Sequence, residues 1–167
     1  CERHGVNALI LTSESESRAV AKARQRFTSR NIAVSVGKLS TVSLMTDKLL
    51  MLETLQKAGV NVGEFVGVSS FVEARTALHA MGYPKRKVVL KPRQSTGSRG
   101  VLFADSSVPI FEYLLKDRFC GTGTLEILAK EMEQHDMSFA NMLALPYYGD
   151  CAYDVDCVAQ RGAAVTI

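Results

Sequence analysis

The sequence lacks the patterns that mark disulfide-rich, zinc-binding and membrane proteins. It has no C-x-x-C pair, and none of its three histidines stands at metal-site spacing from its four cysteines, Cys1, Cys120, Cys151 and Cys157. Cys151 and Cys157 could meet across a tight turn, but free thiols in a reducing cytoplasm are the simpler interpretation. No apolar run is long enough to cross a membrane or to serve as a signal peptide. We therefore expect a cytoplasmic protein with no membrane partner.

A strong excess of positive charge is also absent. The chain has 20 Lys and Arg against 17 Asp and Glu, and the basic residues are scattered apart from Lys85-Arg86-Lys87. A nucleic-acid binder usually gathers a larger basic excess on one face, so we expect no nucleic-acid partner. With 47% hydrophobic and 22% charged residues, the 167-residue chain can bury a sizeable core.

The two ends of the chain resemble the interior of a longer sequence. The first residues, 1–6, read as the tail of a helix that leads into a strand, and residues 163–167 read as an unfinished strand. We therefore expect a segment of a longer polypeptide.

The first forty residues predict a parallel βαβ unit. Apolar runs at 7–11 and 32–36 are typical of short buried strands. Residues 13–27 lie between them and combine helix-start residues with an apolar stripe. Strand, helix and strand in that order favour a parallel pair.

Two capped helices are expected next. Thr46 is suited to N-cap the first of them, with Asp47 in its first turn and Gly59 at its end. Ser70 and Glu73 form a capping box for the second. The other expected elements are a strand at 65–68, a hairpin at 88–104, helices at 111–115 and 124–134, a strand pair 141–145 and 153–158 around a turn at 148–150, and a last strand after a turn at 161–162.

The hairpin at 88–104 carries the most informative residues. An apolar run leads to Lys91 and ends at Pro92. A Gly/Ser/Thr loop that contains Arg93 and Arg99 follows, and then the next apolar run begins. Glycines allow close approach of the backbone, exposed N–H groups and hydroxyls donate hydrogen bonds, and the cations add positive charge. This chemistry suits a phosphate group.

The order of these landmarks resembles the ATP-grasp superfamily, especially its carbamoyl-phosphate-synthetase-like and carboxylate–amine ligase members. The resemblance covers nearly the whole chain. It rests on Asp47-Lys48, Gly59-Val60, Gly82-Tyr83-Pro84, Lys91-Pro92, Gly97-Ser98-Arg99-Gly100-Val101 and Tyr153-Asp154-Val155-Asp156.

The resemblance implies a mixed α/β (α+β) fold in two parts. Residues 1–40 would be the C-terminal part of a small α/β pre-ATP-grasp domain. Residues 41–167 would be the nucleotide-binding lid half of an ATP-grasp domain, with lid and hinge strands, truncated before the metal site.

The same resemblance implies a set of nucleotide-binding residues. Lys48 would point toward the phosphates from the start of its helix, and Lys91 would reach the α-phosphate and the adenine side. Ser95, Thr96, Gly97 and Ser98 would cover the β- and γ-phosphates as a mobile lid, completed by Gly100. Arg99 would face the phosphates, solvent or the second lobe.

The expected hinge at 145–152 departs from the family pattern. Leu145 stands near the usual glutamate, and Ala152 stands at or near the acidic residue that takes the ribose hydroxyls. Asp150 or Asp154 could replace the latter with a small register shift. Backbone groups near Leu145 and Tyr147 would still bind adenine, while Tyr147 and Tyr148 would pack at the hinge.

The resemblance implies an ATP-dependent ligase. Its partners would be ATP and a small carboxylate, with phosphoryl transfer giving an acylphosphate that an amine attacks, and a homodimer would be usual. Mg²⁺ would be the second cofactor, with ligands beyond this chain, so the sequence predicts no metal ligand here. The main alternative is a catalytically degenerate nucleotide-binding module with a regulatory or scaffolding role. A weaker one is a flavodoxin-like or other α/β domain whose loop binds a different anion.

Overall fold

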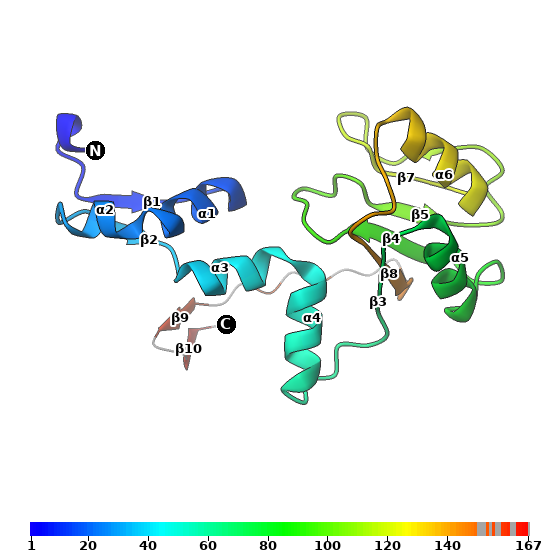
Figure 1. Cartoon of the computed structure of the whole chain (residues 1–167), viewed down its shortest axis with the longest axis horizontal. Helices are drawn as coiled ribbons and strands as arrows, with labels where there is room; N and C mark the ends of the chain where they lie inside the picture. Colours follow the sequence, from blue (N-terminus) through cyan, green and yellow to red (C-terminus); the bar gives the residue numbers. More distant parts are fainter. Residues whose placement is uncertain (150–152, 154, 156–157, 161–162, 167) are drawn as a thin grey trace.

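The computed structural model describes residues 1–149, 153, 155, 158–160 and 163–166. Two bodies lie toward opposite ends of its long axis, a small α/β unit near the N-terminus and a six-stranded sheet with its helices (Figure 1). Helices α3 (Leu39–Thr46) and α4 (Lys48–Lys57) connect them. The mixed α/β class expected from the sequence is therefore confirmed.

The N-terminal unit is the expected parallel βαβ arrangement. A 3₁₀ turn at Glu2–His4 precedes strand β1 (Ala8–Ile10), which pairs in parallel with β2 (Ala33–Ser35). The intervening helix is divided at Ala23 into α1 and α2, which span Glu14–Lys22 and Arg24–Thr28.

The helix expected to begin after a Thr46 cap differs in detail. Thr46 is the last residue of α3, a helix that the sequence analysis did not predict, and Asp47 is the N-cap of α4. Asp47 has an extended backbone, and its Oδ1 accepts the N–H of Leu50 at 3.2 Å. A carboxylate satisfies this free N–H and also favours the positive end of the helix dipole, so Asp47 caps better than Thr46.

The larger sheet has the strand order β3-β8-β4-β5-β7-β6. All neighbours in it are antiparallel except β5 and β7. The expected hairpin at 88–104 is confirmed as the β4–β5 pair. The strands are β3 (Val66–Val68), β4 (Val88–Pro92), β5 (Leu102–Ala104), β6 (Glu112–Tyr113), β7 (Gly121–Gly123) and β8 (Met142–Pro146).

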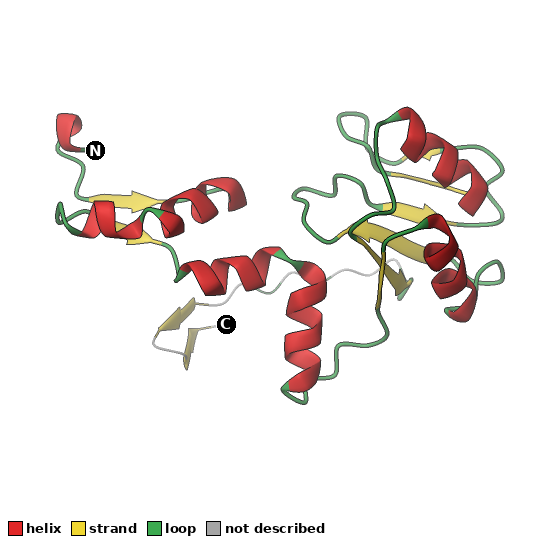
Figure 2. Cartoon of the chain, in the orientation of Figure 1, coloured by secondary structure: helices red, strands yellow, loops and turns green. Residues whose placement is uncertain are grey.

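Helices α5 (Phe71–Ala80) and α6 (Leu125–Gln134) lie on one side of this sheet (Figure 2). Leu78 and Leu128 are fully buried there with Leu90 of the central strand β4. Thr124 caps α6, while Ser70 caps α5 and Glu73 reaches back one residue further than a simple capping box, to the N–H and Oγ of Ser69.

The helix expected at 111–115 is wrong. Glu112 and Tyr113 form the edge strand β6, and Gly121-Thr122-Gly123, which lies between the two helices expected at 111–115 and 124–134, is the buried strand β7. The ring of Phe111 occupies the space beside Gly121, where a Cβ would stand 2.3 Å from Phe111 Cζ. The absence of a side chain at Gly121 therefore lets the two segments pair.

The strand pair expected between 141–145 and 153–158 is also wrong. Strand β8 pairs with β3 and β4 instead. Leu143 and Ala144 are fully buried at its centre, and a buried strand needs backbone partners on both edges. Tyr153 and Val155 belong to no strand. The expected final hairpin is confirmed as the antiparallel pair β9 (Val158–Gln160) and β10 (Ala163–Thr166).

Within the described residues, no helix reaches the length and apolar character that a membrane crossing requires.

Candidate functional site

The register of the large sheet separates a covered face from a second face. In β4, Val88 and Leu90 face the helices and are fully buried, so Val89 and Lys91 face the other way. Residues directly opposite one another share a face. The second face therefore carries Val89, Lys91, Phe103, Leu143, Leu145, Gly67 and Thr122.

This second face offers a half-buried apolar platform beside one lysine. Val89, Phe103 and Leu145 lie side by side on three adjacent strands and are each partly exposed. Lys91 follows two residues after Val89 on the same face. Burial lowers the pKa of Lys91, and the nearby charge of Lys48 lowers it further. The site thus combines an apolar surface with a cation drawn partly out of water.

Lys48 enters the same region from the first turn of α4. Its Nζ donates to the carbonyl oxygen of Ser95 at 2.9 Å, to Ser95 Oγ at 3.3 Å and to the carbonyl of Arg93 at 3.5 Å. Burial lowers the pKa of Lys48, while the charges of Glu14 and Asp47 oppose part of that change. Lys48 therefore holds the start of the loop that follows β4.

An ion pair between Asp47 and Arg93 fixes this geometry, and no sequence motif indicated that the two residues would meet. Arg93 Nε donates to Asp47 Oδ1 at 3.1 Å and Nη2 donates to Oδ2 at 2.8 Å. Burial alone would raise the pKa of Asp47, but the hydrogen bonds from Arg93 and from the Leu50 N–H lower it overall. The one available sequence signal was adjacency, since Asp47 precedes Lys48 and Arg93 follows Lys91-Pro92.

We call residues 95–100 the phosphate loop. Gly97, Ser98 and Gly100 all have positive φ, at 59°, 61° and 76°. A Cβ on Gly100 would stand 2.6 Å from Pro92 Cγ, so any residue other than glycine would overlap Pro92 here. Gly100 also donates its N–H to the carbonyl of Phe119 at 2.6 Å. The loop is therefore a tightly turned segment with a fixed C-terminal end.

The middle of the phosphate loop is exposed and rich in free donors. Thr96, Gly97 and Ser98 are exposed, and within the described part of the chain their N–H groups have no acceptor. Arg99 turns back on the loop, since its N–H and its Nη1 both donate to the carbonyl of Thr96, at 3.3 and 3.4 Å. Free N–H groups in such a turn form a concave anion site.

Leu145 and Tyr147 lie at the end of β8, on the platform side. Leu145 pairs with Val89, and the ring of Tyr147 meets Phe103 edge-to-face at a centroid distance of 5.8 Å. Lys87 Nζ lies 5.1 Å from the centre of the Tyr147 ring. Tyr147 therefore packs at the edge of the platform, as the sequence analysis expected for the hinge tyrosines, whereas Tyr148 is exposed and accepts the N–H of Glu64 on its hydroxyl.

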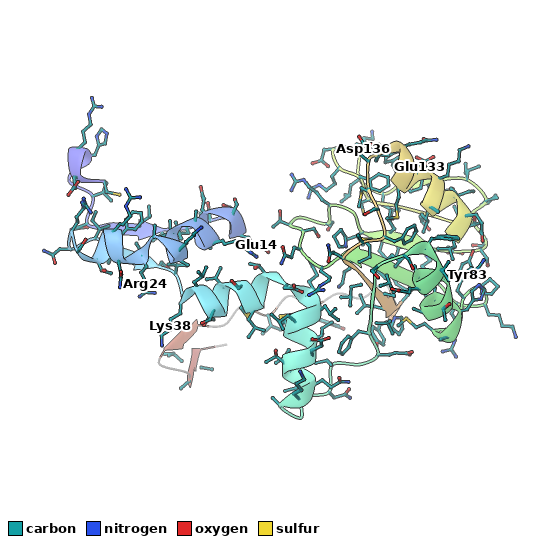
Figure 3. The ribbon with its side chains drawn as sticks, in the orientation of Figure 1. Glu14, Arg24, Lys38, Tyr83, Glu133 and Asp136 are labelled. Atoms are coloured by element: carbon teal, nitrogen blue, oxygen red, sulfur yellow. The ribbon has the colours of Figure 1, made fainter. Side chains whose placement is uncertain are left out.

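A cavity of about 610 Å³ lies between α1 and the phosphate loop. Glu14, at the end of α1 nearest the large sheet, contributes to it together with Ser95 and Thr96 (Figure 3). A second cavity of about 420 Å³ adjoins Asp47 and Arg93. Open volume therefore lies beside the start of the loop and beside the ion pair that precedes it.

The structure brings most of the predicted nucleotide-binding residues to one place. Lys48, Lys91 and Ser95 form a contiguous group, with Leu145 on the neighbouring strand and Thr96 to Gly100 beside them. The possible ribose ligands Asp150 and Asp154 lie outside the described residues, as do Ala152, Asp156, Cys151 and Cys157. No group of three or more His, Cys, Asp or Glu side chains among the described residues could hold a metal ion.

Comparison with solved structures identifies the fold. The chain aligns with N5-carboxyaminoimidazole ribonucleotide synthetase from Thermus thermophilus at a TM-score of 0.51 and 15% identity, covering 87% of this chain and 31% of that one. It aligns with the biotin carboxylase domain of Hydrogenobacter thermophilus 2-oxoglutarate carboxylase, solved as a dimer with MgADP, ADP and bicarbonate, at a TM-score of 0.57 and 19% identity, covering 88% and 29%. Both are ATP-grasp enzymes.

The chain has the ATP-grasp fold. It spans about three tenths of each of these enzymes, and at such identities the likeness establishes the fold alone. No protein-family model and no curated protein matches the sequence. The ATP-grasp resemblance drawn from the sequence motifs is thus confirmed at the level of the fold.

Proposed function

We propose that this chain is the ATP-binding part of an ATP-dependent carboxylate–amine, or carbamoyl-phosphate-like, ligase. The observation that carries the proposal is the convergence of Lys48, Lys91 and the phosphate loop at the edge of the apolar platform. Two lysines supply point charges for phosphate, and the loop supplies N–H donors. The platform of Val89, Phe103 and Leu145 is suited to a flat, apolar base.

The proposed reaction needs little covalent chemistry from the protein. A carboxylate oxygen attacks the γ-phosphorus of ATP, the bond from that phosphorus to the β,γ-bridging oxygen breaks, and ADP leaves. An amine then attacks the acyl carbon of the acylphosphate and phosphate leaves. Lys48, Lys91 and the loop would orient the triphosphate and offset its charge. The described residues offer no metal site of their own, so we propose that Mg²⁺ enters as the ion that accompanies ATP.

The direct test is calorimetric titration of MgATP into the longest soluble polypeptide that contains these 167 residues. Lys91→Met and Lys48→Met should each weaken binding about tenfold or more, the loss expected for one charge-assisted contact. Lys57→Met is the matched control, because Lys57 lies in the last turn of the same helix as Lys48 and is exposed. Lys91→Met should unfold no earlier than the wild type, since it removes a desolvated charge beside another lysine. Absence of MgATP binding by the wild-type chain would overturn the proposal.

A catalytically degenerate nucleotide-binding module is the second candidate. The observation that favours it is the aliphatic Leu145 at the platform, near the position where the ATP-grasp resemblance implies a glutamate. Phosphate release from MgATP, measured with a panel of small carboxylates and ammonia, separates the two. Acid-dependent release supports the ligase, whereas tight nucleotide binding with no release for any acid supports the module. The cytoplasmic location, the homodimer and the division into 1–40 and 41–167 belong to the same proposal.

A further inference from the structure

The segment that links β6 to β7 contacts the phosphate loop at two points. Arg118 Nη1 donates to the carbonyl oxygen of Gly97, and the carbonyl of Phe119 accepts the N–H of Gly100. These contacts join segments that are well separated in the sequence. The middle and the C-terminal end of the loop are therefore attached to an element outside the hairpin.

Arg118 approaches Gly97 so closely that a side chain at residue 97 would require the guanidinium to shift. A Cβ built on Gly97 would stand 2.8 Å from Arg118 Nη1, closer than such contacts occur. The guanidinium is itself oriented by Asp117, whose Oδ2 accepts from Nη2 at 2.8 Å and whose two oxygens accept from Nε at 3.3 Å. Arg118 is 28% exposed and Asp117 67%, so the arginine is the more enclosed member of the pair.

Arg118 and Lys48 hold opposite ends of the same exposed stretch. Lys48 donates to the carbonyl of Ser95, and Arg118 donates to the carbonyl of Gly97. Each cation donates to one carbonyl oxygen. The N–H groups of the peptide units between these two carbonyls have no acceptor among the described residues. Both contacts restrict the backbone where these donors would meet an anion.

We propose that Arg118 is a positioning residue of the phosphate loop, which it fixes at the Gly97 carbonyl so that the N–H groups of residues 96–98 are presented together to the terminal phosphates. This inference rests on the proposed nucleotide-binding function. Ordering a free backbone segment costs about 1–2 kcal/mol per residue, and an anchor present before binding removes part of that cost from the binding step. In the sequence, Arg118 lies between the helices expected at 111–115 and 124–134, and no short pattern there indicates a role for it.

The inference predicts an effect that depends on the number of phosphates. AMP lacks the β- and γ-phosphates that the loop would cover, whereas ATP carries both. Loss of Arg118 should therefore lower the affinity for ATP and leave the affinity for AMP almost unchanged. A purely structural loss of packing would weaken both ligands together.

The test compares Arg118→Gln and Arg118→Lys with the control Lys116→Gln, an exposed neighbour in the same segment. In nucleotide-free protein, Arg118→Gln should speed hydrogen exchange at the hydrogen-bonded loop amides of Arg99 and Gly100 about tenfold or more, while the core amides of α5 and α6 keep wild-type protection. MgATP affinity should fall about tenfold with AMP affinity changed less than about twofold. Arg118→Lys keeps one donor and should recover part of both effects.

Two results would overturn the inference: loop exchange in Arg118→Gln equal to that in Lys116→Gln, or equal losses of ATP and AMP affinity. The exchange measurement needs no ligand. If the wild-type chain fails to bind MgATP, the nucleotide-binding function fails, while the anchoring role is still decided by the exchange rates.

Discussion

Asp47 and Arg93 form a two-point ion pair that joins the N-cap of α4 to the first residue after β4. The Nη2–Oδ2 distance is 2.8 Å and the Nε–Oδ1 distance is 3.1 Å. The same Asp47 Oδ1 also accepts an N–H of the first helical turn, from Leu50. One carboxylate thus sets both the start of the helix that carries Lys48 and the path of the strand end that carries Lys91.

Replacement of Asp47 by Asn should separate these two roles. Asn still caps a helix, but it leaves the partly buried Arg93 without its charged partner, so the free energy of unfolding should fall by about 2 kcal/mol. Asp47→Ala should lose about 1 kcal/mol more, because the cap is lost as well. Urea unfolding monitored by circular dichroism measures both. Glu133→Gln, at an exposed position on α6, is the control, and equal stability of Asp47→Asn and that control would contradict the role of the pair.

The same pair predicts a specific dependence of stability on acid. The pKa of Asp47 is lower in the folded protein than its ordinary value of 3.8, so the folded state favours the ionised form. Its contribution is complete well above pH 3.8 and is lost as the pH falls through the lowered folded pKa. The difference in unfolding free energy between wild type and Asp47→Asn should therefore shrink below that pH.

In the difference in unfolding free energy between wild type and Asp47→Asn, the contributions of the other acidic groups cancel. Hydrogen bonds from Ser69 lower the pKa of Glu73, and hydrogen bonds from Ser107 lower that of Asp105, but both groups are present in wild type and variant alike. Urea unfolding of the two proteins from about pH 7 down to about pH 3 gives the comparison. If the difference in unfolding free energy stays constant over this range, Asp47 stabilises the fold through the geometry of its side chain and not through its charge.

Gly100 tests how tightly the phosphate loop is packed. An added Cβ would lie 2.6 Å from Pro92 Cγ and 2.9 Å from Met137 Cε, at a φ of 76°. Gly100→Ala should cost about 3 kcal/mol, combining backbone strain with overpacking. Gly59→Ala, at a φ of 82° with no atom near the added Cβ, should cost about 1 kcal/mol. Equal losses in thermal or urea unfolding would show that the contact with Pro92 relaxes freely.

Elements with strong local signals could be predicted from the sequence. The β4–β5 hairpin follows from two apolar runs around a Gly-rich loop, and α6 follows from its Thr124 cap and apolar stripe. Helix α3 lacks a capping signal, because Lys38 at its N-cap makes no side-chain hydrogen bond to the helix. Strand β7 reads locally as a helix break and becomes a strand because it is buried between β5 and β6. Such burial is a tertiary effect that overrides propensity.

The candidate site divides in the same way. Lys91 was a candidate because it stands at the end of an apolar strand before a Gly-rich loop, and Lys48 was a candidate because the ATP-grasp resemblance implies a lysine at the start of its helix. The contacts that orient them join distant segments, as Arg93 does with Asp47 and Arg118 with Gly97. No short pattern in one sequence specifies such contacts, and they appear only when the strand register brings the segments together.

The lowered pKa of Lys91 predicts that nucleotide binding takes up protons in alkaline solution. Burial and the charge of Lys48 favour the neutral amine in the free protein, so part of the Lys91 population loses its proton below the ordinary pKa of 10.5. A bound phosphate favours the ammonium again, and affinity for MgATP should fall as the pH rises through the lowered pKa. Calorimetry at about pH 9 in two buffers of different ionisation enthalpy measures the protons taken up.

Lys91→Arg is the matched variant for this measurement, because guanidinium stays charged at that pH. It should bind MgATP with a smaller proton uptake than the wild type, the remainder coming from Lys48, whose pKa burial also lowers. Its affinity should vary less between about pH 7 and about pH 9. Identical proton uptake in the two proteins would mean that the amine of Lys91 does not meet the phosphates, and the binding assignment would then rest on Lys48 and the loop.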